Sequence, residues 1–184
     1  LGTLNLDEFA AGGTGVNLWF GRCKNPLDPL RITGGSSSGS AAAVSAGFCL
    51  ASIGSDAGGS IRIPAAFCGV YGLKPTYGRV GRAGAVPRTW SMDCIGPLAS
   101  SVDDLGIVLA AISGFDADDP TSRGDSDFIW TRQGFDNPPR IGVLPDKSGG
   151  HMPLAQYERA VRSIEQSGFP LIPKSLDKLD LYTE

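Results

Sequence analysis

Two glycine-rich loops that each carry serine constrain this chain more than any other feature of its sequence. The first covers residues 34–40 (GGSSSGS) and the second covers residues 56–62 (DAGGSIR). Glycine frees the backbone so that successive N–H groups can converge on one point and bind negative charge. Acyl transfer through a serine needs a nucleophile, a proton relay and donors of this kind. The two loops therefore predict a serine-dependent acyl-transfer site.

Composition excludes several other classes of function. The chain has 184 residues, enough for one hydrophobic core, and its net charge of −3 comes with no basic run, which argues against direct nucleic-acid binding. Its longest apolar stretch, residues 41–53, is interrupted by Ser45, Gly47 and Ser52, so no membrane span is expected. Because the chain begins at Leu1 rather than at a methionine, we expect it to be a fragment of a longer protein.

The cysteines give no sign of a metal site. Cys23, Cys49, Cys68 and Cys94 are spaced too widely for a CxxC motif. Cysteine in apolar runs usually behaves as a small buried hydrophobe. We therefore expect four reduced thiols in a cytoplasmic protein, with no metal and no organic cofactor.

The order of the expected elements indicates an α/β fold, because strands alternate with helices. Ser101 and Asp104 form an S-x-x-D capping box, which predicts the start of a helix that Gly114 ends. Residues 12–33 are expected to be loop, and residues 116–139 a polar surface excursion. Helices or helical turns are predicted over 7–10, 40–49, 60–67, 102–113 and 154–166, and strands over 50–55, 70–73, 140–144 and 169–172.

The first loop admits two other interpretations. A phosphate cradle is disfavoured, because the loop has no lysine in the Walker position and lacks the G-x-G-x-x-G order. Residues 35–39 do match G-x-S-x-G, the nucleophile elbow, with Ser37, a downstream aspartate and His151 as a possible triad. An elbow must follow a strand, whereas residues 25–33 hold two prolines and no apolar run. The elbow stays open as an alternative.

In the second loop the residues around Ser60 suggest supporting roles. Asp56 could brace the loop by accepting backbone hydrogen bonds, and Arg62 could form an ion pair with a nearby carboxylate. Taken alone, the loop could equally be an ordinary glycine turn.

Both loops together resemble the amidase signature family over a long and specific stretch. The similarity is carried by the serine-glycine loop, by SAAAV at 40–44, GSD at 54–56, GGSIR at 58–62, PAAFCG at 64–69 and GLKPT at 72–76. Flanking segments agree: NLDEFA at 5–10, YGR at 77–79 and GPL at 96–98. The resemblance implies an α/β/α sandwich around a mixed central sheet, only part of which is present. It implies a single partial domain over 1–184, with a signature core at 1–115, the excursion at 116–139 and a strand-helix-strand continuation at 140–184.

The resemblance also implies a Ser–Ser–Lys catalytic group. Ser60 matches the nucleophile, and Ser36 matches the bridging serine that the family holds beside a cis peptide bond. The family's lysine falls before Leu1, and neither Lys24 nor Lys74 replaces it. An oxyanion hole is implied at the amides of Ala57, Gly58, Gly59 and Ser60, supported by Asp56, Ser37 and Arg62.

Three functions follow from the resemblance. The favoured one is a free-standing amidase that hydrolyses a small carboxamide through a serine acyl-enzyme and that could form a homodimer. The second is the glutaminase (A) subunit of a tRNA-dependent amidotransferase, which alone would require partner subunits. The third is a non-catalytic amidase-like scaffold. The 184 residues by themselves are expected to be inactive, and Trp90 and Met92 are either pocket or core residues.

Overall fold

The computed structural model describes residues 1–123, 128–131, 134, 136–144 and 154–174. The chain divides into two compact units, Leu1–Arg132 and Gln133–Glu184, and both serine loops belong to the first. The division into core, excursion and continuation stays a prediction, and part of residues 116–139 lies outside the described residues.

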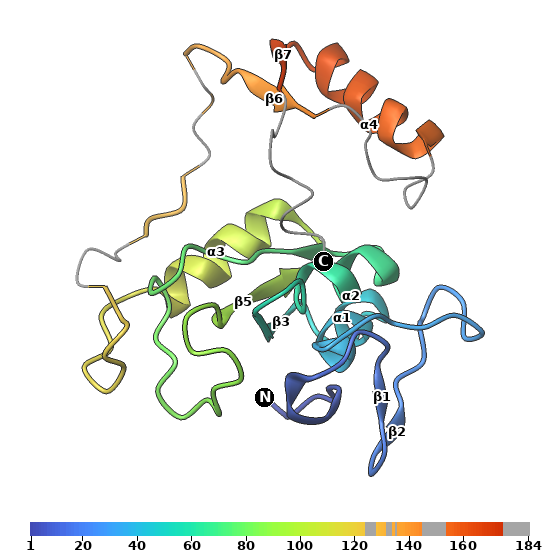
Figure 1. The fold of residues 1–184 in the computed structure, drawn as a ribbon, viewed down its shortest axis with the longest axis vertical. Coiled ribbons are helices and arrows are strands. Elements are labelled where there is room, and N and C mark those ends of the chain that lie inside the picture. Colours follow the sequence, from blue (N-terminus) through green and yellow to red (C-terminus); the bar gives the residue numbers. More distant parts are fainter. Residues whose placement is uncertain (124–127, 132–133, 135, 145–153, 175–184) are drawn as a thin grey trace. The chain divides into compact units, whose positions relative to one another are not determined.

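The first unit is built around a three-stranded antiparallel sheet of order β3-β5-β4 (Figure 1). A two-stranded hairpin, β1 with β2, lies within the segment 12–33 that was predicted to be loop. The elements of this unit are the 3-10 helix η1 (Glu8–Ala10), β1 (Val16–Asn17), β2 (Gly21–Arg22), α1 (Ser38–Ser45), β3 (Ala51–Asp56), α2 (Arg62–Cys68), β4 (Tyr71–Gly72), β5 (Cys94–Ala99) and α3 (Val102–Ile112).

Helix α1 lies close to the sheet because its inward side chains are small. Ala41 is fully buried in a cluster with Ile61, Ala65, Cys68 and Leu98, and Val70 packs against this cluster. Alanine costs little conformational entropy in a helix and lets the backbone approach a neighbouring strand closely.

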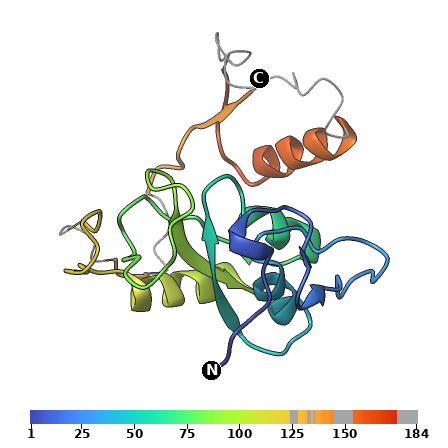
Figure 2. The same cartoon turned by 60° about the horizontal axis from the view of Figure 1, so that its bottom comes forward.

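Two serine hydroxyls fasten α1 to β3. Ser40 Oγ donates to the Ile53 carbonyl at 2.8 Å, and Ser52 Oγ donates to the Ser40 carbonyl at 2.8 Å. These bonds hold the start of α1, and with it the first serine loop, against the strand that leads into the second loop. In Figures 1 and 2 the N-terminal segment, drawn in blue, lies beside this start of α1, where the Gly39 N–H donates to the Asn5 carbonyl at 2.8 Å.

The capping-box prediction is confirmed. The Asp104 N–H donates to Ser101 Oγ at 3.1 Å, and α3 begins at Val102, the residue that follows this cap.

The second unit is a strand-helix-strand arrangement in which β6 (Ile141–Val143) pairs in parallel with β7 (Leu171–Pro173), with α4 (Leu154–Gln166) between them in the chain. Parallel pairing requires such a crossover connection. Within the described segments, every helix is too short or too polar to span a bilayer.

The central strand β5 was not predicted, because Gly96 and Pro97 punctuate it. Proline lacks an N–H and is rarely found in a central strand. In an antiparallel strand the N–H and C=O of one residue point to the same side. The Pro97 carbonyl accepts from Leu73 N–H at 3.0 Å, just beyond the end of the two-residue β4. The side of Pro97 that lacks an N–H therefore faces the end of the short strand β4, where the absent hydrogen bond weakens the sheet little.

The mixed α/β class is confirmed, whereas several boundaries differ. Helix α1 begins at Ser38 and ends at Ser45, not over 40–49, and Gly47 follows it with a φ of 73°. Helix α2 begins at Arg62, not at residue 60, and ends at Cys68. Gly69 follows it with a φ of 68°, the left-handed geometry that terminates helices.

Candidate active site

Ser36 occupies a sheltered position in the first loop. The Gly35–Ser36 peptide bond is cis, as the resemblance predicted. Ser36 is 1% exposed, and its Oγ is buried without a hydrogen-bond partner among the described residues. A buried hydroxyl without a partner is costly and needs an explanation, which the role predicted for Ser36 would supply. The hydroxyls of Thr33, Ser38 and Ser113 are in the same condition, so this property alone does not single out Ser36.

Ser37 joins the two serine loops. Its N–H donates to the Ser60 carbonyl at 3.1 Å. Its Oγ donates to the Ser55 carbonyl at 3.2 Å and accepts from the Ser55 N–H at 3.1 Å. The Ser37 hydroxyl is therefore engaged by the backbone at the end of β3, whereas the predicted chemistry belongs to Ser36 and Ser60.

This geometry counts against the nucleophile elbow. Residues 23–37, all of them described, contain no strand that could lead into G-x-S-x-G. His151, the histidine of the possible triad, lies outside the described residues.

Asp56 holds the second loop through three backbone N–H groups. Its side chain is fully buried, and it accepts from the N–H of Gly59 at 2.7 Å, of Ile61 at 3.1 Å and of Arg62 at 3.4 Å. Arg62 Nε and Nη2 each donate to the same carboxylate at 3.0 Å. Burial by itself raises the pKa of Asp56, but the hydrogen bonds from Arg62, Ile61 and Gly59 outweigh it and lower the pKa below its ordinary value.

Arg62 is the outer partner of this pair. Its side chain is 54% exposed, and the hydrogen bond to Asp56 raises its pKa further, so it stays charged. The ion pair closes the loop as a structural contact, and the loop is not an ordinary glycine turn.

The amides predicted for an oxyanion hole are not equivalent. The Gly59 N–H is occupied by Asp56, whereas in the described part of the chain the N–H groups of Ala57, Gly58 and Ser60 donate to no protein acceptor. A Cβ at Gly58 would meet no atom within 4 Å, so the space around this residue is open. The arrangement can therefore offer three free donors to a bound oxyanion.

A cavity of about 1330 Å³ adjoins the first loop. Ser36 and Ser37 line it, and Ser60 does not. The other walls come from the N-terminal segment, from parts of residues 48–55 and 82–95, and from residues 118–120. Trp90 is among the lining residues and Met92 is not, and both are exposed rather than core residues.

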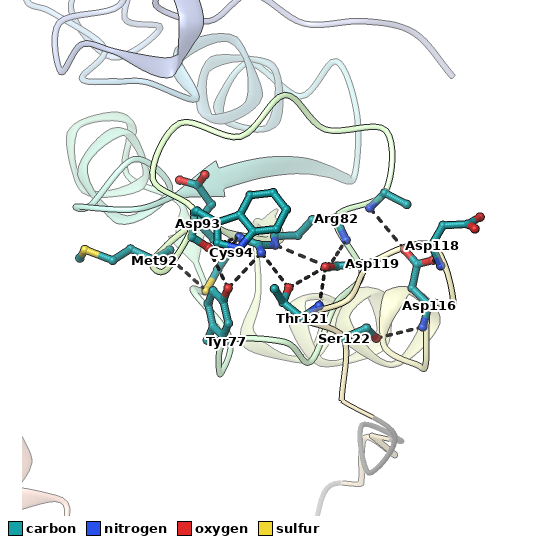
Figure 3. Close-up of polar contacts among 12 residues, drawn as sticks. Tyr77, Arg82, Met92, Asp93, Cys94, Asp116, Asp118, Asp119, Thr121 and Ser122 are labelled. Atoms are coloured by element: carbon teal, nitrogen blue, oxygen red, sulfur yellow. Dashed lines mark hydrogen bonds and ion pairs between the residues drawn. The ribbon is translucent and has the colours of Figure 1, made fainter.

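The wall formed by residues 82–95 is anchored by Arg82, a residue that no sequence motif singles out. Figure 3 shows its guanidinium lying between Tyr77 and Asp119. It donates to Thr121 Oγ1 at 2.7 Å, to Tyr77 Oη at 3.0 Å and to the Trp90 carbonyl at 3.0 Å, and its Nε lies 3.5 Å from Asp119 Oδ2. Both charged side chains are nearly buried, so this is a satisfied internal network.

Asp119 lies in the segment 116–139 that was predicted to be a surface excursion, yet it is buried. Burial raises its pKa, but hydrogen bonds from Thr121 and from the Arg82 N–H, together with the Arg82 charge, lower the pKa below its ordinary value. The charge of Asp119 is thus maintained opposite Arg82.

The whole length of the chain matches one protein family. The family model described as Amidase covers residues 1–184. This chain belongs to the amidase family.

Several amidase relatives match most of this chain. The A subunit of glutamyl-tRNA(Gln) amidotransferase from Helicobacter hepaticus is 45% identical over 179 residues, which cover 95% of this chain and 40% of the relative. The corresponding protein from Staphylococcus aureus is 55% identical over 133 residues, or 72% of this chain and 27% of the relative. The chain thus spans about 40% or less of the length of these curated relatives.

Solved structures agree in fold. The crystal structure of the glutamyl-tRNA(Gln) amidotransferase A subunit from Thermotoga maritima has a TM-score of 0.89 at 39% identity, over 96% of this chain and 40% of that one. The native peptide amidase from Stenotrophomonas maltophilia has a TM-score of 0.81 at 35% identity, over 96% of this chain and 39% of that one.

In this amidase-family chain, neither Lys24 nor Lys74 lines the cavity beside Ser36. Lys24 is exposed, and Lys74 Nζ donates to the Pro75 carbonyl at 2.9 Å and to Cys94 Sγ at 3.6 Å. In the segments that the structure describes, no group of three His, Cys, Asp or Glu side chains is placed to hold a metal ion.

The four cysteines are free thiols, and Cys68 is the most sheltered of them. Burial raises the pKa of Cys68 to about 11 and also raises that of Cys23. At neutral pH both thiols are therefore mainly protonated, which disfavours reaction as thiolates.

Proposed function

We propose that this chain is part of the glutaminase subunit of a tRNA-dependent amidotransferase. The proposal is supported by the similarity to the A subunit of glutamyl-tRNA(Gln) amidotransferase at 45% identity over 95% of the chain. The structural observation that best supports this chemistry is that the two serine loops are held together. The Ser37 N–H of the first loop donates to the Ser60 carbonyl of the second.

In this mechanism Ser60 is the nucleophile and attacks the carboxamide carbon of glutamine. Its proton passes to Ser36, whose buried Oγ has no partner among the described residues and is free to receive it. Ser36 hands its own proton to the lysine that the resemblance places before Leu1. The relay returns a proton to the leaving ammonia, and water then hydrolyses the acyl-enzyme to glutamate.

The tetrahedral intermediate carries a negative oxygen that must be stabilised. The amides of Ala57, Gly58 and Ser60 supply donors for it, and Asp56 keeps the loop in shape through Gly59 and Ile61. One such donor is typically worth about 3–4 kcal/mol of the barrier. Ser37 and Arg62 support the site without contacting the reacting atoms.

A free-standing amidase acting on a small carboxamide is the second candidate. It is favoured by the similarity to the peptide amidase from Stenotrophomonas maltophilia, at 35% identity and over nearly the same share of the chain. The two candidates share one mechanism and differ in the fate of ammonia. The amidotransferase transfers it with the help of partner subunits, whereas the free-standing enzyme releases it.

The first experiment treats the full-length protein with a serine-reactive fluorophosphonate and maps the adduct by peptide mass spectrometry. We expect an adduct on Ser60 that is absent in Ser60→Ala and forms about 100-fold or more slowly in Ser36→Ala, since the relay is lost. Ser37→Ala serves as the control and keeps the label on Ser60. An adduct on Ser37 would refute the assignment, and no adduct would favour the scaffold.

Substrate assays then separate the two enzymes. The protein is purified with and without affinity-tagged partners and assayed for ammonia release from glutamine and from a series of simple carboxamides. Co-purifying polypeptides and a preference for glutamine support the amidotransferase. Rapid turnover of simple carboxamides by the lone polypeptide would instead establish the free-standing amidase.

A further inference from the structure

The orientation of Ser36 is not set by its own hydroxyl, since Ser36 Oγ has no hydrogen-bond partner among the described residues. A serine that relays a proton must nevertheless be held in one geometry, because proton transfer requires hydrogen-bond distances on both sides. The backbone around Ser36 must therefore be held by its neighbours.

The N-terminal segment supplies part of this support. The Asp7 N–H donates to the Ser36 carbonyl at 3.0 Å, and the Gly39 N–H donates to the Asn5 carbonyl at 2.8 Å. A Cβ at Gly39 would lie 2.5 Å from Asn5 N, so this segment lies directly on the serine loop.

The Asp7 carboxylate reaches the peptide immediately before Ser36. Asp7 is buried, and it accepts from Gly15 N–H at 2.9 Å and from Thr14 N–H at 3.1 Å. A Cβ at Gly35 would lie 2.5 Å from Asp7 Oδ1 and 2.8 Å from its Cγ. One side chain therefore fixes the 14–15 turn and at the same time forms the wall against which the Gly35–Ser36 peptide rests.

We propose that Asp7 is a positioning residue, which aims Ser36 by clamping the Gly35–Ser36 backbone between its main chain and its carboxylate. The proposal rests on the proposed function, because it assigns Asp7 to the Ser60–Ser36 relay. Asp7 does not touch the reacting atoms. Its carboxylate acts through the Gly35 backbone, and its main chain acts through the Ser36 carbonyl.

The test compares Asp7→Asn with Glu8→Gln in the full-length protein. Both changes replace a carboxylate by an amide at adjacent positions, but Glu8 is exposed. In Asp7→Asn one carboxylate oxygen is replaced by an NH2 group, which donates and cannot accept, so either the Gly15 or the Thr14 N–H loses its acceptor. A displacement of reacting groups by about 1 Å can cost on the order of 100-fold in rate, so we expect kcat to fall by roughly 10- to 100-fold.

Three readouts separate positioning from a purely structural role. The first is kcat per active site, with sites counted from the endpoint of fluorophosphonate labelling. The second is KM, which we expect to change less than about twofold, since the carboxylate contacts no substrate. The third is the rate of Ser60 labelling, which should fall in step with kcat, whereas Glu8→Gln matches the wild type in all three.

The labelling rate also distinguishes failure of this proposal from failure of the proposed function. A wild-type protein that labels at Ser60 but hydrolyses no amide refutes the function, and the labelling rates still test Asp7. A folded Asp7→Asn protein with the wild-type labelling rate overturns the positioning role. If Asp7→Asn does not fold, Asp7→Glu carries the test, and loss of fold in both variants overturns the proposal in favour of a structural role.

Discussion

Replacing Asp56 by asparagine is expected to lower the free energy of unfolding by about 1.5–4 kcal/mol. The amide retains one acceptor oxygen, so either the Gly59 or the Ile61 N–H is left buried without an acceptor, which costs about 1–3 kcal/mol. Loss of the charge pair with Arg62 adds only about 0.5–1 kcal/mol, because that side chain is 54% exposed and screened by water.

Arg62→Gln is the matched variant, since it removes the ion pair but leaves the backbone hydrogen bonds from Gly59, Ile61 and Arg62 to Asp56 intact. It is expected to cost about 1 kcal/mol. Urea unfolding of the full-length variants measures both values, and hydrogen exchange of peptides over residues 56–62 reports the loop itself. Equal destabilisation by the two variants would refute the reasoning, because it would mean that the ion pair, not the backbone bonding, holds the loop.

The lowered pKa of Asp56 adds a dependence on pH. The unfolded carboxyl titrates near pH 3.9, and the folded one titrates lower. Its contribution to stability is therefore fully present above the unfolded pKa and is lost as the pH falls through the folded pKa. Asp56→Asn should remove this pH-dependent contribution to stability. The difference in free energy of unfolding between wild type and variant is therefore expected to become smaller as the pH falls.

Three further outcomes are expected. Ser101→Ala removes the cap of α3 and should lower the free energy of unfolding by about 1 kcal/mol in urea titrations, and no change would show that the cap hydrogen bond is replaced by water. Cys68, buried and with a pKa of about 11, should react with iodoacetamide only after unfolding, whereas the partly exposed Cys49 reacts in the native state. Arg82→Lys replaces a five-donor fork by a single ammonium beside buried Asp119 and should cost about 2–4 kcal/mol in thermal unfolding, and a loss under 1 kcal/mol would contradict the network.

Local features of this fold were predictable because their signals lie within a few residues. Ser101 and Asp104 predicted the start of α3 to the residue, since a capping box acts over one helical turn. The boundaries of α4 were also correct. By contrast β5 was missed, because Pro97 is acceptable only opposite the end of β4, a fact set by strand pairing and not by neighbours in the chain.

The candidate site divides in the same way. The sequence by itself determined the family, the two serine loops and the residues of interest, Ser36, Ser60 and Asp56. These residues could be found because they lie at characteristic spacings within one continuous segment of the sequence. Only the tertiary structure decided that the Gly59 amide is taken by Asp56, which leaves a smaller set of free donors. The tertiary structure alone also showed that Arg82 pairs with Asp119. The two residues are 37 positions apart in the chain, and the Arg82 backbone N–H donates to Asp119 Oδ2. Contacts at that separation depend on how loops pack, and the sequence alone does not distinguish one buried arginine from its exposed neighbours.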